Sequence, residues 1–390
     1  MAGHPSFFKR YDQPNFGLDI GHMNKLRSKH PNGQILVLNL GSSSLKFSLI
    51  HSISLENEKS GSTTLNLEGA IQTVMELVNK SAIIAIGYRV VQGGPNHISP
   101  ELVSEKLLLD LEAYIYLAPN HLPDEIKLIK AFTQAFIGIP HFACFDTYFH
   151  KDMPAHSKFY PLPQKYSEMG LVRYGFHGLS YESIFQQMLE EDIDVANQKI
   201  IIAHLGSGAS MVAIAGGVSQ DTTMGISPMG GLVMATRSGD LDPGAILFML
   251  KQDHLSVQQL DVMLSNESGL KAIAGTTDMK SIIQNRNKDK KAGEAFDLFC
   301  YQSKKYIGSL AASLGGIDLL VFCGGIGENS ALVREVICTD MEFMGITLNL
   351  SSNDNNQGII SCLNSKVAVR VMKTDEELII ARHIQNILLV

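Results

Sequence analysis

A glycine, three serines and a lysine lie between two apolar runs near the start of the organised sequence. The segment LNLGSSSLKFSLI covers residues 38–50 and contains Ser42, Ser44 and Lys46. A tight turn between two strands needs glycine or small polar residues, but it needs neither three hydroxyl groups nor a lysine. Backbone N–H groups, hydroxyl groups and a cation together suit a bound phosphate group. The segment therefore predicts a hairpin whose turn contacts phosphate.

Two arginines stand beside glycine turns. Arg89 lies in YRVVQGG and Arg237 lies in TRSGDLDP. A guanidinium group next to a glycine turn and an apolar strand marks a place where the backbone makes room for an anion. Other reactive side chains also fall at predicted strand ends and turns, namely Asn39, His121, Asp146, His177, His204, Asp240 and Asp242.

The elements that must position these groups follow from the pattern of apolar residues. The spacing predicts a helix over 123–136, because Pro123 stands near its start and its first turn is acidic. Short apolar runs predict buried strands. These strands lie on either side of the opening turn within 34–53, over 82–94, and over 141–146, the last ending at Asp146.

A second copy of the first hairpin follows at residues 200–217. Strand, Leu-Gly-Ser, small residues and strand recur there, so that Gly206 matches Gly41. The two glycines stand 165 positions apart, about half of the organised chain. This distance favours a duplicated domain, and the alternative is a chance likeness of two Gly-Ser hairpins.

Two further segments flank the C-terminal part. LLVFCGGIGENS, residues 319–330, predicts a strand and a glycine-rich turn before a helix at 331–337, a pattern typical of a phosphate or adenosine loop. The last segment, TDEELIIARHIQNILL, predicts an amphipathic helix. Thr374 and Glu377 fit a capping box, which explains Glu377 but leaves Glu376 without a structural role.

Composition limits the function classes. The chain has 390 residues, 45% of them hydrophobic, and a net charge of −7, which favours two or three globular domains and argues against nucleic acid as a partner. Five scattered cysteines without a CxxC predict reduced thiols and a cytoplasmic location. We find no segment typical of a signal peptide or a membrane span. Residues 1–33 are predicted to be an N-terminal extension.

From about Gln34 onward the sequence resembles the acetate kinases, a family of the acetate and sugar kinase/Hsp70/actin superfamily. The resemblance rests on NLGSSSLKFSL, RVVQGG, FDTYFHKDMP, YGFHGLSY, HLGSGAS, TRSGDLDPG, GGIGENS and TDEELIIAR. It implies an α/β fold of two duplicated ribonuclease-H-like domains with an ATP cleft between them. The implied domains are residues 34–147 plus 376–390, and the nucleotide-binding residues 148–375.

The resemblance also implies a reaction and its residues: transfer of a phosphoryl group from ATP to acetate in a homodimeric enzyme that uses Mg²⁺, or Mn²⁺ in its place. The implied catalytic residues are Asn39, Arg89, His121, Asp146, His177 and Arg237, and the acetate would contact Arg89, Val91, Asn120, Phe176 and Pro228. The metal ligands would be Asn39, Asp146 and Glu376. Nucleotide contacts would come from Ser42, Ser44, Lys46, His204, Gly206, Ser207, Gly208, Asp278, Gly325, Gly327, Glu328 and Asn329.

Several positions depart from the family pattern. Asn120 stands where a leucine lines the acetyl pocket, and Ser207 replaces an asparagine expected at the nucleotide phosphates. Gln92 and Gly230 replace a histidine and a glutamate. These departures leave two alternatives open: a kinase of propionate or another short-chain acid, and a catalytically impaired paralogue that binds nucleotide. A sugar kinase is disfavoured, because a hydroxyl acceptor requires a general base.

Overall fold

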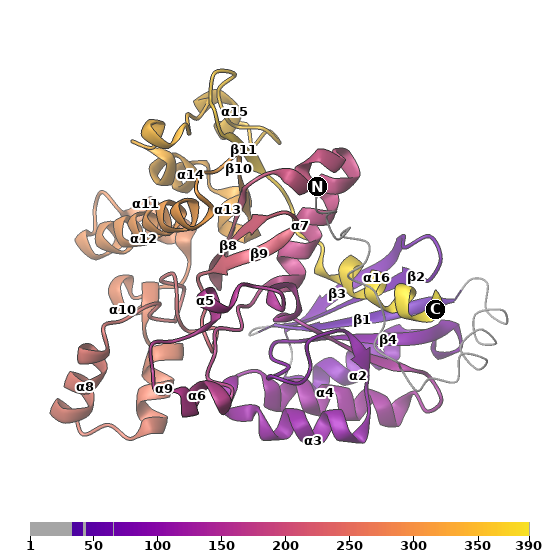
Figure 1. The fold of residues 1–390 in the computed structure, drawn as a ribbon. Coiled ribbons are helices and arrows are strands. Elements are labelled where there is room, and N and C mark those ends of the chain that lie inside the picture. Colours follow the sequence, from indigo (N-terminus) through magenta and orange to yellow (C-terminus); the bar gives the residue numbers. More distant parts are fainter. Residues whose placement is uncertain (1–32, 42–43, 65, 390) are drawn as a thin grey trace. The chain divides into compact units, whose positions relative to one another are not determined.

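The computed structural model describes residues 33–41, 44–64 and 66–389, and the chain divides into two compact units (Figure 1). Unit 1 holds the described residues up to Tyr148 together with those from Asp375 onward. Unit 2 is Phe149–Thr374. Ser42 and residues 1–32 of the predicted extension lie outside the described residues.

The described part of unit 1 contains a six-stranded sheet of order β3-β2-β1-β4-β6-β5. Strands β1 to β3 form an antiparallel meander, and β1, β4 and β6 run parallel. The strands are β1 (Gln34–Leu40), β2 (Leu45–His51), β3 (Asn57–Thr63), β4 (Ile83–Val90), β5 (Glu101–Leu102) and β6 (His141–Phe145), and the helices are α2 (Leu67–Leu77), α3 (Glu105–Ala113), α4 (Leu122–Ala135) and α16 (Glu376–Leu389).

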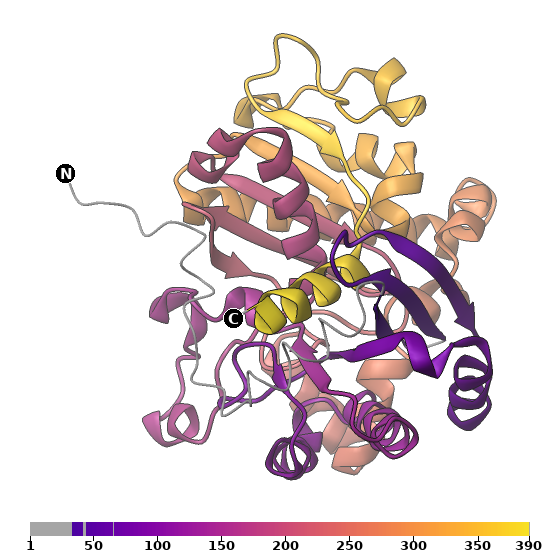
Figure 2. The same ribbon diagram turned by 90° about the vertical axis from the view of Figure 1, so that its right-hand side faces the viewer.

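Both faces of this sheet are covered, which explains why its central strands are almost continuously apolar. Residues 35–38 of β1 have no solvent exposure. Helix α16 contacts β1, β2, β4 and β6, whereas α4 contacts β4 together with α2 and α3. Figures 1 and 2 show α16, the last element of the chain, beside strands formed by its first described residues. The C-terminus therefore completes the core of unit 1.

Gly87 in β4 allows this close approach of α16. A Cβ atom at position 87 would lie 2.5 Å from Cδ1 of Ile384 and 2.6 Å from Cγ2 of Ile380. Overpacking of this kind costs about 1–3 kcal/mol, so we expect Gly87→Ala to lower the free energy of unfolding by that amount in chemical denaturation. Gly308→Ala is the control, because a Cβ atom there meets nothing within 4 Å. Equal stability of the two variants would contradict the prediction.

The described part of unit 2 contains a five-stranded sheet of order β11-β10-β7-β8-β9. Helix α7 contacts β7, and the long helix α12 contacts β7, β8 and β9. The strands are β7 (Ile200–Leu205), β8 (Ala209–Ala215), β9 (Val218–Thr222), β10 (Leu319–Cys323) and β11 (Ala368–Val371). The helices are α5 (Ala155–Lys158), α6 (Gln164–Glu168), α7 (Gly178–Glu191), α8 (Pro243–Gln252), α9 (Val257–Asn266), α10 (Gly269–Ala274), α11 (Met279–Asn285), α12 (Lys290–Leu314), α13 (Gly324–Asn329), α14 (Ala331–Cys338) and α15 (Leu350–Asp354).

The two sheets repeat one topology, which confirms the predicted duplication. In unit 2, β7, β8 and β9 form the antiparallel meander, and β7, β10 and β11 run parallel. Gly41 directly follows β1, and Gly206 directly follows β7. The two Gly-Ser hairpins are therefore equivalent elements of two copies of one fold.

None of the five cysteines, all of which are described, forms a disulfide bond. In the described residues, no helix is both long enough and apolar enough to cross a bilayer. The predicted glycine-rich turn after β10 is wrong, because residues 324–329 form the short helix α13 directly after the strand.

Candidate active site

Unit 1 gathers three of the expected residues at one edge of its sheet. Strands β1, β4 and β6 are parallel neighbours, so their carboxyl ends meet at the same edge. Asn39 lies near the end of β1, Arg89 near the end of β4, and Asp146 directly after β6. This topology explains why side chains distant in sequence lie close together.

The partly buried Arg89 and the buried Asp146 form a two-pronged ion pair. Nη2 of Arg89 lies 2.5 Å from Oδ2 of Asp146, and Nε lies 3.2 Å from Oδ1. Nη1 of Arg89 donates to the carbonyl oxygen of Leu40. Burial opposes the charge on Arg89, but Asp146 and Glu376 outweigh it and raise the pKa of Arg89 above its ordinary value. The guanidinium group is therefore a permanent cation at the sheet edge.

Helix α16 brings two more carboxylates to this edge. Nδ2 of Asn39 donates to Oε2 of Glu376 at 2.9 Å and to Oε1 of Glu377 at 3.0 Å, and Oε2 of Glu376 lies 3.9 Å from Nε of Arg89. The predicted capping box is wrong. The helix begins at Glu376, and Asp375 accepts a hydrogen bond from the backbone N–H of Leu378, so Asp375 is the capping residue. Glu377 contacts Asn39 and does not serve as a cap.

Glu125 in α4 is a site residue that the sequence analysis missed. Its side chain is 2% exposed, and its Oε2 accepts a hydrogen bond from the backbone N–H of Val91 at 3.1 Å. Burial raises the pKa of Glu125 to about 8, although Arg89 and the Val91 N–H group act in the opposite direction. The sequence showed only an acidic first helical turn, and that feature already has an explanation in the helix dipole.

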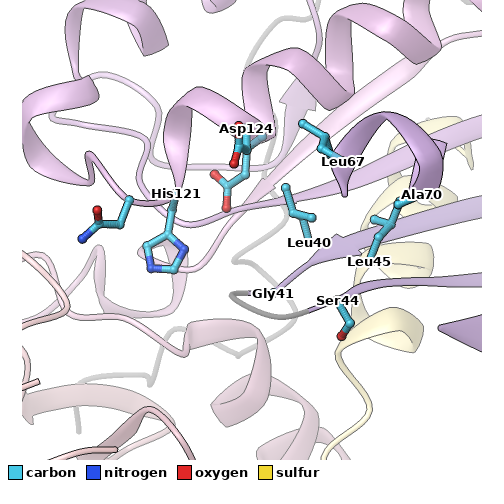
Figure 3. Close-up of a pocket in the computed structure, with 10 residues that line it drawn as sticks. Leu40, Gly41, Ser44, Leu45, Leu67, Ala70, His121 and Asp124 are labelled. Carbon is cyan, nitrogen blue, oxygen red and sulfur yellow. The ribbon is translucent and has the colours of Figure 1, made fainter. Parts of the chain in front are cut away.

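Asn120 and His121 precede α4 and line a pocket with Glu125. The pocket has a volume of about 190 Å³, and residues of the β1–β2 turn and of α2 complete its wall (Figure 3). Ser44 belongs to this wall, and its carbonyl oxygen accepts the Gly41 N–H that closes the turn. Lys46 is exposed on β2. The pocket thus joins the predicted phosphate turn to the predicted acetate residue Asn120 and the predicted catalytic residue His121 of the same unit.

In unit 2, His177 is held in a defined orientation. It has a left-handed backbone, with φ 58°, directly before α7. Its Nδ1 lies 2.8 Å from Oγ of Ser210, which is also hydrogen-bonded to the hydroxyl group of Tyr181. The ring centroid of His204 lies 4.5 Å from that of His177. Neither Ser210 nor Tyr181 was expected as a site residue.

The glycines of the second hairpin leave space beside these histidines. A Cβ atom on Gly208 would lie 3.2 Å from Nε2 of His177 and 3.6 Å from Nη1 of Arg237. A Cβ atom on Gly206 would lie 3.8 Å from the backbone nitrogen of Gly325 and 3.8 Å from Nε2 of His204. The structure therefore brings these predicted nucleotide and catalytic positions of unit 2 together.

The side chain of Arg237 is held by a residue of the same unit. Its Nη1 donates to the carbonyl oxygen of Pro228 at 3.2 Å. Phe176 is buried, and its carbonyl oxygen accepts a hydrogen bond from Nε2 of His150 at 3.1 Å. Pro228 therefore contacts the catalytic candidate Arg237 directly, whereas Phe176 contacts His150.

Other predicted nucleotide residues make mainly local contacts. Asp278 caps α11, because its carboxylate accepts hydrogen bonds from two backbone N–H groups of that helix. Oε1 of Glu328 accepts the N–H of Gly324, and Nδ2 of Asn329 donates to the carbonyl oxygen of Gly325. Gly327 is buried, and Ser207 is exposed at the second hairpin turn.

His150 gives unit 2 a predicted sensitivity to acid. It is 1% exposed, and burial lowers its pKa to about 4. Between pH 6.5 and 4 the unfolded chain therefore binds a proton that the folded chain does not, so stability falls as the pH falls, by roughly 3 kcal/mol in full. We expect His150→Gln to flatten this part of the stability profile in urea denaturation at several pH values. An unchanged slope would contradict the assignment.

The chain is similar to known proteins both in sequence and in structure. The sequence model of the Acetokinase family matches residues 54–382. An acetate kinase of Rickettsia typhi is 38% identical over 383 residues, which cover 91% of this chain and 99% of the relative. The crystal structure of an acetate kinase from Porphyromonas gingivalis has a TM-score of 0.80 at 32% identity, and that of a propionate kinase from Francisella tularensis has 0.83 at 33%. Each alignment covers 90% of this chain and 98% of the solved one.

The duplicated ribonuclease-H-like fold is that of the acetate and sugar kinase/Hsp70/actin superfamily. Within it the chain belongs to the acetokinase family, because the family match spans most of the chain and relatives of that name align over almost their entire length. This membership confirms the resemblance inferred from the sequence.

Proposed function

We propose that the chain is an ATP-dependent acetate kinase that reversibly forms acetyl phosphate and ADP. The observation that carries the proposal is the set of charged groups at the sheet edge of unit 1, where the partly buried Arg89 meets Asp146 and Glu376. In unit 2, Arg237 and His177 supply a second cation and a hydrogen-bond donor. Such groups are what transfer between two anions requires.

The chemistry needs no general base, because acetate is already ionised at pH 7. A carboxylate oxygen forms the new bond to the γ-phosphorus of ATP, the bond to the bridging oxygen breaks, and ADP leaves with that electron pair. No proton is transferred. Coulomb repulsion between the two anions at ~3–4 Å amounts to several kcal/mol. Arg89 would offset it by holding the acetate, and Arg237 by holding the transferred group.

The remaining residues would orient the nucleotide and stabilise the transferred phosphoryl group. His177 would donate to the equatorial oxygens of the transferred phosphoryl group, with His121 as a supporting donor. The nucleotide would contact the two Gly-Ser hairpins and the start of α13, with Ser44, Lys46, His204, Gly206, Ser207, Gly208, Asp278, Gly325, Gly327, Glu328 and Asn329 as proposed contacts. We also propose that units 1 and 2 correspond to the two domains, with bounds at 147/148 and 375/376.

A magnesium site fits the residues of unit 1. Asp146 and Glu376 both approach the same guanidinium group, and Asn39 is hydrogen-bonded to Glu376. The described residues contain no cluster of three or more acidic, histidine or cysteine ligands. Two carboxylates and an amide oxygen suit Mg²⁺, or Mn²⁺ in its place, because Mg²⁺ keeps several waters. When bound, the ion would neutralise charge on the phosphates.

The homodimer implied by the resemblance remains a proposal. Helix α8 has no buried residue, and Leu247, Phe248 and Val257 are exposed by 53%, 64% and 74%. An apolar surface of this kind is typical of an interface between copies. Sedimentation velocity tests this state. The cytoplasmic location stays a prediction.

Initial rates of ADP formation test the function. The assay uses Mg²⁺–ATP with acetate, propionate or butyrate, for the natural chain and for Arg89→Ala and Arg237→Ala. Turnover with acetate that is lost in both variants supports the proposal. Preference for propionate would favour the second candidate, a kinase of longer acids, which the polar Asn120 in the acceptor region supports. If a folded protein that binds ATP turns over none of the acids, the result would favour the alternative of a catalytically impaired paralogue.

A further inference from the structure

The pocket of unit 1 is lined by both polar and apolar side chains. Asn120, His121 and Glu125 come from α4 and the segment before it, whereas Leu45 and Leu67 come from β2 and α2 (Figure 3). Its volume of about 190 Å³ exceeds what a two-carbon acid fills. For scale, an engineered apolar cavity of about 150 Å³ holds a benzene molecule.

One polar atom in this pocket lacks a partner. Oε1 of Glu125 is buried and has no hydrogen-bond partner among the described residues, although Oε2 of the same carboxyl group is bonded to Val91. A buried polar atom left unpaired costs about 1–3 kcal/mol. Because Glu125 lines the pocket, a ligand bound there is the available source of a partner for this oxygen.

The carboxyl group adjoins the proposed acetate site through two contacts. Glu125 accepts a hydrogen bond from the backbone N–H group of Val91. Val91 is proposed to contact the acetate and lies two positions after Arg89. Arg89 in turn donates to the carbonyl oxygen of Leu40, which lines the pocket. Arg89, Asp146 and Asp124 are the charged groups that act on Glu125. An acid held at Arg89 would therefore have its carbon chain near the pocket.

We propose that Glu125 determines acceptor specificity and that the preferred acceptor is a short-chain hydroxy acid whose hydroxyl group hydrogen-bonds to Oε1 of Glu125. This inference rests on the proposed kinase function and names the substrate class of the same site. The transfer itself is unchanged: the carboxylate oxygen is phosphorylated, and the hydroxyl group neither gains nor loses a covalent bond.

A hydroxyl group matches this carboxyl group in either protonation state. The raised pKa of Glu125 favours the protonated form at neutral pH, whose O–H group donates to the hydroxyl oxygen. When Glu125 is ionised, the ligand hydroxyl donates instead. The methyl group of an unsubstituted acid does neither, so it would leave the buried oxygen unpaired. Asn120, His121 and Asp124 add further polar groups to the same pocket.

Matched acids provide the test. The kinase assay compares acetate with glycolate, propionate with 3-hydroxypropionate, and butyrate with 4-hydroxybutyrate. We expect at least one hydroxy acid to exceed its parent acid about 10-fold or more in kcat/KM, mainly through KM, because sites built to bind a hydroxyl group reject analogues that lack it. Glu125→Met should reduce this ratio about 10-fold or more. Glu125→Gln should retain part of it, since an amide both donates and accepts.

Controls separate this inference from the proposed function. Lys130→Met changes an exposed residue of the same helix, 47% exposed and paired with Glu112, and should leave the ratio unchanged. Turnover of acetate without preference for any hydroxy acid, or a preference that persists in Glu125→Met, overturns the inference alone. If no acid turns over, the kinase proposal fails. Calorimetry of each acid pair with the full chain then still tests Glu125, and equal binding of both members overturns its role.

Discussion

Arg89→Ala is expected to lower kcat/KM for acetate by about 10²–10³-fold and to destabilise unit 1. The first effect follows because the variant loses a preorganised cation where two anions must meet, and single donors of this kind are worth about 10²–10³ in rate. The second effect follows from Asp146, which is 1% exposed and would lose its charged partner. Leaving one charge of a buried pair uncompensated costs about 3–5 kcal/mol. Steady-state rates and urea denaturation measure the two effects separately.

Matched variants decide between these two effects. The double variant Arg89→Ala/Asp146→Asn should regain much of the stability, because no uncompensated charge remains, but none of the activity. Arg89→Lys should stay folded yet lose most of its rate, since an ammonium group cannot make the two-pronged contact. Lys130→Ala breaks an exposed pair with Glu112 and should change stability by less than about 1 kcal/mol. Wild-type rates in Arg89→Ala would overturn the assigned role.

Local patterns were enough to predict the groups that lie at strand ends. Arg89 and Asp146 follow apolar runs, and parallel strands must bring such ends together. The duplication was visible because Gly41 and Gly206 each begin the same turn. These features depend on residues within one strand or one turn, so the sequence carries them directly.

Features that depend on distant contacts were not predicted. Glu125 looks like an ordinary acid of a first helical turn, and only the approach of Val91 shows its burial. Thr374 and Asp375 are both good capping residues one position apart, and the contacts of Asn39 with Glu376 and Glu377 accompany the start of the helix at Glu376. The sequence favoured the wrong cap because capping patterns are local and those contacts are not.

His177→Ala is expected to lower kcat by about 10²–10³-fold while the KM values for ATP and acetate change much less. The bond between Nδ1 and Ser210 fixes the ring, and Nε2 is the nitrogen on the side of Gly208 and Arg237. A donor aimed at charge that grows in the transition state contributes to kcat more than to binding. Steady-state kinetics with each substrate varied measures this separation.

Ser210 tests whether orientation is part of that effect. Ser210→Ala removes the partner of Nδ1 but keeps the imidazole, so a loss of about 10-fold in kcat is expected, and Tyr181→Phe should lose less because Ser210 still bonds to the ring. Adding either substitution to His177→Ala should cause little further loss, since residues that act as a unit are not additive. If the losses instead multiply, Ser210 acts independently of His177. Activity in His177→Ala within a few-fold of the natural chain would remove the histidine from the mechanism.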